Sequence, residues 1–299
     1  MAETLFGLTL ALAREIEKGG LYEGATTVGG VGTDLTLTDA TNPLTAGVLN
    51  GGTLWITTGL RAGQSRIITS HAAGGILVWT PALSGGTLAV GDQYAAFGPE
   101  FPRDLLRRAV NTALRNLPPF ARYNVATLTV ANQEDYDLPA SVENIRSLEV
   151  ANLVYDALDP AKSLHYMRHT GWTEITQTEG LAAPAPAIRF WKYPPAVDGY
   201  RIRLGYNVIH PVLTADAEFI NDGVSPPRLI YEALAEAWLK RIRPRDSQAL
   251  DEQAQVMYNR AVAMAKMMPR HHINTLPQPI FIAGVGSRGA GTVNPDLVP

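Results

Sequence analysis

The sequence predicts an α+β protein: a helical bundle or hairpin with a β-rich middle, an inserted small antiparallel β-barrel or sandwich, and an extended C-terminal arm. Three observations predict this fold class. Residues 19–98 hold 17 of the 27 glycines between short alternating apolar runs, which is typical of β-hairpins. Helical periodicity precedes and follows that stretch. Residues 271–299 are rich in proline and glycine but almost uncharged, so they fit neither a helix nor a solvated disordered tail.

The first expected element is a short amphipathic helix. Four apolar side chains recur on one helical face: Leu5, Leu8, Leu12 and Ile16. Glu3 stands where a secretory signal would carry basic residues, so we interpret the segment as a packed helix and not as a signal peptide. No run approaches the ~20 apolar residues of a membrane helix, and we expect no membrane partner. Residues 1–20 and 99–124 form the predicted helical core.

Residues 21–98 form the predicted inserted β domain. Alternating runs separated by Gly, Asn and Pro turns predict strands at residues 34–38, 53–57, 65–69, 76–80 and 92–97. Trp55, Trp79 and Tyr94 have two interpretations. They fill the core of a small barrel, which we favour, or they stack on a bound glycan. The second interpretation would make this a module that binds glycan, receptor or fibre.

Helical periodicity returns at residues 102–117 and ends at Pro118-Pro119. Its apolar stripe consists of Leu105, Leu106, Ala109, Val110, Ala113 and Leu114. Four arginines surround the stripe: Arg103, Arg107, Arg108 and Arg115. A solvated polar face is the ordinary reason for such a pattern. An arginine-rich face also suits contacts between subunits, so the four are candidates for a ring interface.

The rest of the predicted folded part is a β-rich region followed by a helical hairpin. Residues 125–225 contain candidate strands at 125–131, 144–150, 187–193 and 200–208. The sequence pattern of residues 226–270 predicts two helices, at 227–243 and 246–268. In the second helix, apolar residues recur at heptad spacing: Leu250, Ala254, Met257, Ala261, Met264 and Met268. We interpret this seam as the core of an intrachain hairpin, the alternative being an intermolecular coiled coil.

The arm at residues 271–299 carries only Arg288 and Asp296 as charges. Its apolar run, Ile280-Phe281-Ile282-Ala283, suits a strand that pairs with another protein. A monomer gains little by keeping such a segment in water, whereas a partner supplies strand hydrogen bonds and apolar burial. The arm therefore indicates assembly and not catalysis.

Composition excludes several classes of function. The net charge of −3 and the pI of about 6.1 give no overall basic footprint for non-specific nucleic-acid binding. The absence of cysteine excludes disulfides, thiolate nucleophiles and cysteine-ligated zinc. A hydrophobic content of 46% allows a sizeable core.

Two motifs suggest metal or cofactor binding only weakly. His165 and His169 have the spacing of a helical ligand pair, but no cysteine or nearby acidic ligand completes a metal shell. Residues 284–289 match G-x-G-x-x-G, but the residues that remain are too few for the βαβ unit that this loop needs. We predict neither a metal nor a cofactor.

One carboxylate cluster suggests general acid–base chemistry. Glu134, Asp135 and Asp137 could serve a glycan hydrolase, but their place before Leu138-Pro139 fits a polar turn. No nucleophile elbow or phosphate-binding loop occurs. We therefore predict no catalytic residue and no enzyme activity.

Several strings resemble head-to-tail adaptor (connector) proteins of tailed bacteriophages. Residues 134–139 and 142–148 are similar to the passage of extended chain, Leu-Pro and strand found in such proteins. Residues 188–206 are similar to their paired strands. The Ala-rich hairpin and the arm complete the resemblance, which covers residues 1–20 and about 100–299.

The resemblance implies a helical bundle in a structural virion protein that forms a homomeric ring, commonly dodecameric, beneath the portal protein. The ring would join the portal to a tail or nozzle protein in the neck of the virion, after assembly in the host cytoplasm. Genomic DNA would pass through it without sequence-specific binding. The arms would reach into clefts between portal subunits, with these candidate contacts: Leu276, Pro277, Pro279, Ile280, Phe281 and Ile282. The inserted β domain departs from minimal adaptors.

Overall fold

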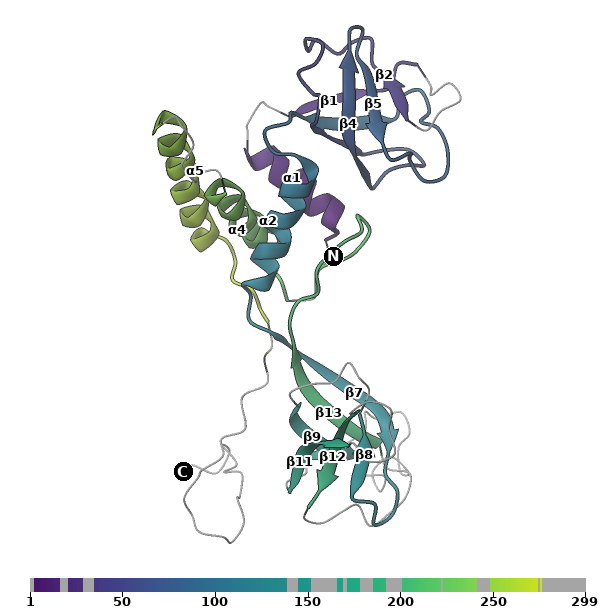
Figure 1. Ribbon diagram of the computed structural model, residues 1–299, viewed down its shortest axis with the longest axis vertical. Helices are drawn as coiled ribbons and strands as arrows, with labels where there is room; N and C mark the ends of the chain where they lie inside the picture. Colours follow the sequence, from purple (N-terminus) through teal and green to yellow (C-terminus); the bar gives the residue numbers. More distant parts are fainter. Residues whose placement is uncertain are drawn as a thin grey trace. The chain divides into compact units, whose positions relative to one another are not determined.

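The computed structural model describes residues 3–16, 21–28, 35–138, 145–151, 166–168, 171–177, 185–191, 201–221, 223–240, 248–273 and 275 (Figure 1). The chain divides into two compact units. The first combines Met1–Leu117 with His210–His272, and the second combines Pro118–Ile209 with Ile273–Pro299. Most of the second unit is therefore inserted, in sequence, between two helices of the first.

Residues 21–98 of the first unit are here called the β module, and its described residues contain a six-stranded antiparallel sheet. Its order is β1-β6-β3-β4-β5-β2. The strands are β1 (Tyr22–Ala25), β2 (Thr36–Thr38), β3 (Thr53–Ile56), β4 (Gln64–Ala72), β5 (Ile76–Thr80) and β6 (Gln93–Phe97). A bridge between Val28 and Thr38 brings the two sheet edges together. The five predicted strands are confirmed with small shifts at their ends, whereas β1 was not predicted.

The aromatic residues of the β module are core residues. Trp79 and Tyr94 are each 1% exposed and pack among the leucines and isoleucines that the strands point inward. Trp55 is also fully buried. Successive side chains of a strand point to opposite faces, so Leu54 and Ile56 enter this core and Trp55 lies on the other face of β3. Side chains this inaccessible cannot stack on a glycan, so that interpretation of the three aromatics is wrong.

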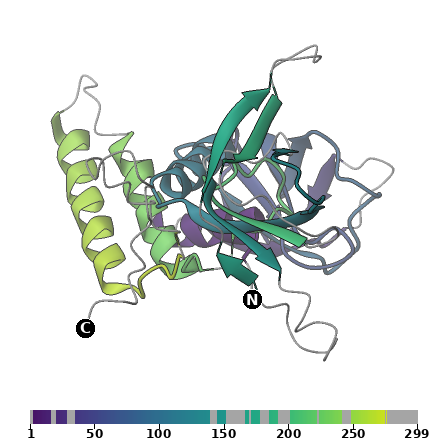
Figure 2. The same ribbon diagram turned by 90° about the horizontal axis from the view of Figure 1, so that it is seen from below.

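Four helices of the first unit lie within the described residues: α1 (Leu5–Ile16), α2 (Arg103–Arg115), α4 (Pro226–Leu239) and α5 (Gln248–Met267). Helices α1, α2 and α4 pack on one another, and α5 packs along α4 (Figure 2). The predicted apolar face of α1 is buried, as is that of α2 except for the half-buried Leu105. None of the described helices is both long and apolar enough to cross a membrane.

The heptad seam of α5 is confirmed as an intrachain contact. Ala254 and Ala261 are at most 2% exposed, while Met257 and Met264 are half-buried. Small side chains let α5 approach α4 closely, and the longer methionines fill the edge of the contact.

Within its described residues, the second unit has two antiparallel sheets. The first has the order β10-β9-β13-β7 and consists of β7 (Phe120–Leu128), β9 (Ile145–Ala151), β10 (Tyr166–Arg168) and β13 (Arg201–Val208). The second has the order β11-β12-β8 and consists of β8 (Asp135–Asp137), β11 (Trp172–Gln177) and β12 (Ala185–Phe190). Side chains from both sheets share one core, in which the Tyr136 and Phe190 rings meet edge to face at 5.5 Å.

The prediction of a polar turn at the carboxylate cluster is wrong. Residues 135–137 form β8, which pairs with β12 so that Asp135 faces Arg189. The two side chains make a bidentate ion pair with both distances at 2.7 Å. A cross-strand pair of opposite charge compensates for the low strand propensity of aspartate.

Candidate functional site

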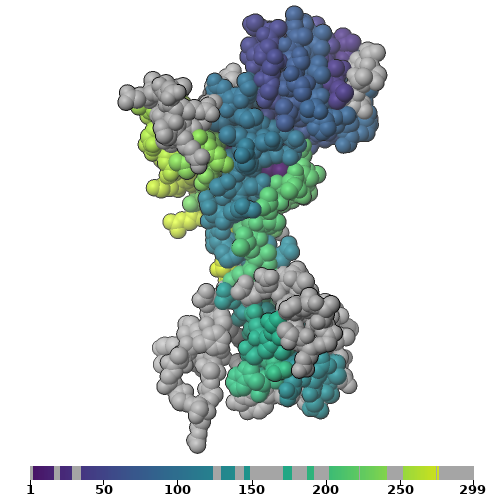
Figure 3. Space-filling model, viewed as in Figure 1, coloured from purple at the N-terminus to yellow at the C-terminus, as the bar shows by residue number. Residues whose placement is uncertain are grey.

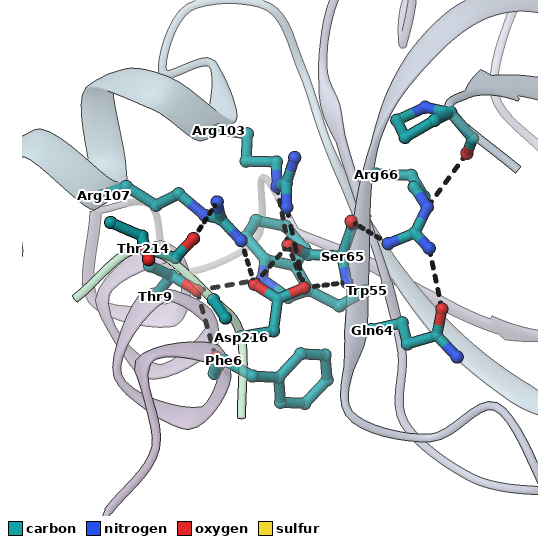
Figure 4. Close-up of polar contacts among 12 residues, drawn as sticks. Phe6, Thr9, Trp55, Gln64, Ser65, Arg66, Arg103, Arg107, Thr214 and Asp216 are labelled. Atoms are coloured by element: carbon teal, nitrogen blue, oxygen red, sulfur yellow. Dashed lines mark hydrogen bonds and ion pairs between the residues drawn. The ribbon is translucent and has the colours of Figure 1, made fainter. Parts of the chain in front are cut away.

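Asp216 joins three segments of the first unit that are far apart in sequence (Figure 4). Its carboxylate accepts a hydrogen bond from the backbone N–H of Ser65 on β4 at 2.7 Å, and others from the Ser65 hydroxyl at 3.0 Å. Arg107 binds the same carboxylate through Nη2, and Nη2 of Arg103 lies 3.6 Å from Oδ2. These four residues are called the Asp216 cluster below.

Helix geometry explains why both arginines reach one carboxylate. Arg103 and Arg107 are four positions apart on α2 and project from the same face. Arg103 Nε also donates to the Ser65 hydroxyl at 2.8 Å, and Arg107 Nη1 donates to the Thr214 carbonyl at 3.0 Å. The three charged side chains are only 11–18% exposed. Charge-assisted hydrogen bonds are strong in such surroundings, and a lost carboxylate would leave two poorly hydrated cations.

Arg66, next to Ser65 on β4, has a separate role. Its guanidinium donates to the carbonyl oxygens of Pro81 and Ala82 and to the Gln64 side chain, at 2.7–3.1 Å. Burial lowers the pKa of Arg66, as does the nearby Arg107, while Asp216 acts to raise it. Arg66 therefore holds the chain that follows β5.

The segment that carries Asp216 also holds the start of α1. The backbone N–H of Phe6 donates to the Asp216 carbonyl at 3.0 Å, and that of Leu5 donates to the Glu218 carbonyl at 2.9 Å. These groups have no partner within the helix, so the segment satisfies donors at its N-terminus. Trp55 Nε1 on β3 donates to the Thr9 hydroxyl on α1 at 3.2 Å. The β module is thus attached to the helices, and in the space-filling view it meets α2 (Figure 3).

An aromatic chain makes a second attachment. The ring of Phe97, at the end of β6, lies 6.2 Å from that of Phe101, which meets the ring of Trp238 on α4 edge to face at 5.0 Å. All three side chains are at most 7% exposed. Such pairs stabilise beyond the area they bury, so this attachment is apolar where the Asp216 cluster is ionic.

Asp39 is a fully buried carboxylate inside the β module. It accepts hydrogen bonds from the hydroxyls of Tyr22 and Tyr94 at 2.8 and 2.9 Å, and from the backbone N–H and hydroxyl of Thr41. Burial acts to raise the pKa of Asp39, but the bonds from Thr41 and the two tyrosines outweigh it and the pKa is lowered. Asp39 is therefore a structural anion.

Residues 271 and 272, where the predicted arm begins, are attached to α4 and the residues just before it. Nε2 of His271 lies 3.1 Å from Glu232 Oε2, and Nδ1 of the same ring accepts the backbone N–H of Ser225 at 3.0 Å. The backbone N–H of His272 donates to the Gly223 carbonyl at 2.7 Å. Arg228 Nε donates to Oε1 of Glu232 at 2.8 Å. The chain is thus fixed at residues 271 and 272, where the predicted arm begins.

Two cavities lined by described residues lie beside α5. One, of about 290 Å³, lies among α2, α4 and α5 and is walled partly by Arg228 and Glu232. The other, of about 220 Å³, lies among α1, α4 and α5 and is mostly apolar, with Trp238 and Met264 among its lining residues. At its rim the Tyr231 hydroxyl donates to Glu15 at 3.0 Å.

The family model described as SU10 adaptor protein matches residues 86–277. The chain belongs to the SU10 adaptor protein family. This is a phage adaptor family, so the chain is a phage structural adaptor protein. The match spans α2, α4, α5 and most of the second unit, whereas most of the β module precedes it. No curated protein was found to match the chain.

The candidate portal contacts of this SU10 adaptor family member lie outside the described residues: Leu276, Pro277, Pro279, Ile280, Phe281 and Ile282. His165, His169 and residues 284–289 lie outside them too. Within the described part of the chain, no three His, Asp or Glu side chains are grouped to hold a metal ion.

The four candidate arginines of the SU10 adaptor family member divide into two pairs. Arg103 and Arg107 face inward to Asp216, whereas Arg108 and Arg115 are exposed. The ring interface stays a prediction, and its accessible part is the outer pair. Sequence reasoning missed Asp216, although the i, i+4 spacing of the inner pair could have indicated a shared acidic partner.

The three carboxylates of the cluster lie on or beside β8 in this adaptor. The hydrogen bond from Arg189 lowers the pKa of Asp135, which is held as an ionised strand residue. Glu134 and Asp137 are exposed at either end of β8.

Proposed function

We propose that this SU10 adaptor family member is a head-to-tail adaptor that forms a homomeric ring beneath the portal and joins it to a tail or nozzle protein. The family match over residues 86–277 carries the proposal, because it includes the helices α2, α4 and α5, most of the second unit and the start of the arm. We further propose that the protein lies in the virion neck, that the ring is dodecameric, and that it has no catalytic role.

The arm is the proposed portal-docking element. Its apolar run at residues 280–283 suits strand addition, and its low charge makes solvation unfavourable compared with burial on a partner. In a ring, every copy would contribute one arm, so weak individual contacts would combine into stable attachment.

The outer face of α2 is the proposed subunit interface. Arg108 and Arg115 are exposed, and their helix is held from its inner face by Asp216. Arginine suits such a place because its planar guanidinium can bind a carboxylate of a neighbouring copy through two hydrogen bonds. The acidic net charge of −3 supports a channel through which DNA passes without sequence-specific binding.

The β module is proposed to contact a tail, fibre or head protein. It lies largely before the family match, so it is an addition to the adaptor framework. Its candidate glycan-stacking residues are in the core, and protein contact is therefore the better-supported role for its surface.

Removal of residues 276–299 tests the docking proposal. We expect the truncated chain to keep its melting temperature to within about 1 °C and to lose co-sedimentation with tailless, DNA-filled heads. A second variant, Arg108→Glu with Arg115→Glu in the full chain, keeps the arm but should weaken ring formation, so it should also attach less firmly because fewer arms act together. Full attachment of the truncated chain, or a large fall in its melting temperature, would contradict the arm's role.

A further inference from the structure

The first turn of α4 has few backbone donors, because Pro226 and Pro227 occupy its first two positions. Proline has no N–H, so of the four donors that a helix N-terminus normally leaves unpaired, only those of Ser225 and Arg228 remain. The Ser225 side chain makes no capping hydrogen bond. The backbone N–H of Ser225 donates to the ring of His271, which follows α5, at Nδ1 and 3.0 Å.

This contact fixes the tautomer of His271. A backbone N–H can only donate, so Nδ1 must be the acceptor and the ring hydrogen must be on Nε2. Nε2 therefore donates to Glu232 Oε2 at 3.1 Å. Both ring nitrogens are thus used within the chain. The side chain of His271 is 9% exposed, and a ring with no free lone pair is unsuited to act as a general base or a metal ligand.

Glu232 is held in place as well. Burial acts to raise its pKa, but hydrogen bonds from His271 and Arg228 outweigh that effect and the pKa is lowered. The carboxylate therefore stays ionised and accepts from both neighbours. The His272 N–H to the Gly223 carbonyl adds a backbone contact one residue further along the chain.

We propose that His271 is a positioning residue that fixes the point at which the C-terminal arm leaves the helical unit. This inference rests on the proposed docking function of the arm. Ordering the root before binding reduces the conformational entropy lost on docking, so a fixed root strengthens attachment without touching the partner.

The chain contains no cysteine, so two introduced cysteines at the exposed positions Leu239 and Arg270, both in the first unit, can carry spin labels for a distance measurement. In the parent we expect one narrow distance distribution. His271→Ala should broaden it, and attachment to tailless heads should weaken about tenfold or more. His271→Asn can keep the bond to Ser225, and His271→Gln can keep the bond to Glu232, so each should restore part of both properties.

His272→Ala is the matched control, because residue 272 is exposed and its backbone N–H is retained in the variant. It should behave as the parent in both measurements. If His271→Ala gives the parent's distances and the parent's attachment, the anchor proposal is wrong. If the parent itself does not bind heads, the proposed docking function fails, while the distance measurement still decides whether His271 fixes the root.

Discussion

Asp216 binds Ser65, 151 positions earlier in the chain, through both its backbone N–H and its hydroxyl. The contact connects β4 of the inserted module to the segment that leads into α4. Arg103 and Arg107 of α2 complete it with two positive charges. The module is therefore held to the helices by an ionic contact as well as by the rings of Phe97, Phe101 and Trp238.

Asp216→Asn should destabilise the first unit by about 3 kcal/mol, because both arginines would lose their carboxylate while remaining mostly buried. Urea denaturation measures the change. Asp104→Asn, at an exposed position on α2, is the control and should cost no more than about 0.5 kcal/mol. Equal effects of the two substitutions would show that the cluster contributes little.

Gly75→Ala should destabilise the β module far more than Gly74→Ala. Both glycines have positive φ, +68° and +76°, so each alanine has a conformational cost of about 1–2 kcal/mol. A Cβ at residue 75 would lie 1.8 Å from the Asp39 carbonyl oxygen, whereas a Cβ at residue 74 would meet nothing within 4 Å. We expect the difference to be about 2 kcal/mol in thermal or urea unfolding, and similar stabilities would refute the predicted clash.

His71 should make the β module less stable in acid. It is 3% exposed, and among the described residues neither ring nitrogen has a hydrogen-bond partner. Burial lowers the pKa of His71 below its ordinary value of 6.5. The unfolded chain then binds a proton more readily than the folded one, so stability falls as the pH drops below about 6.5 towards the lowered pKa.

Urea denaturation at pH 7.5 and 5.5 measures this effect. His71→Leu should lose less stability between the two pH values than the parent, whereas His272→Gln, at an exposed position, should match the parent. An unchanged pH dependence in His71→Leu would exclude His71 as a source of acid sensitivity.

Hydroxyl-radical footprinting should separate the tryptophans by accessibility. Trp191 is 52% exposed, whereas Trp55 and Trp79 are at most 1% exposed. We expect oxidation of Trp191 to be at least about tenfold faster, read by mass spectrometry. Rapid oxidation of Trp55 or Trp79, with protection by an added glycan, would return the glycan-binding interpretation.

Local sequence patterns predicted the helices and strands that bury one face, because their apolar residues recur at a regular spacing. The face of α1 and the alternating strands of the β module could be predicted because one side of each element packs on one core. β1 and β8 were missed because pairing across the sheet, and not their own composition, makes them strands. The intrachain interpretation of the heptad seam of α5 is correct: the seam packs on α4, which its small residues allow to approach closely.

Contacts between distant segments could not be predicted in the same way. Nothing near Asp216 in the sequence indicates Ser65, and nothing near His271 indicates that its ring binds Ser225 at the start of α4. Both sites depend on tertiary placement. The clue to the first was the four-residue spacing of Arg103 and Arg107, and no comparable clue in the sequence pointed to the second.

The most direct test of the adaptor proposal is to mix the purified chain with DNA-filled, tailless heads, image the portal vertex and count the copies bound. We predict a ring of this chain at one vertex of each head. A chain that stays unbound, or that is found elsewhere on the particle, would contradict the adaptor account.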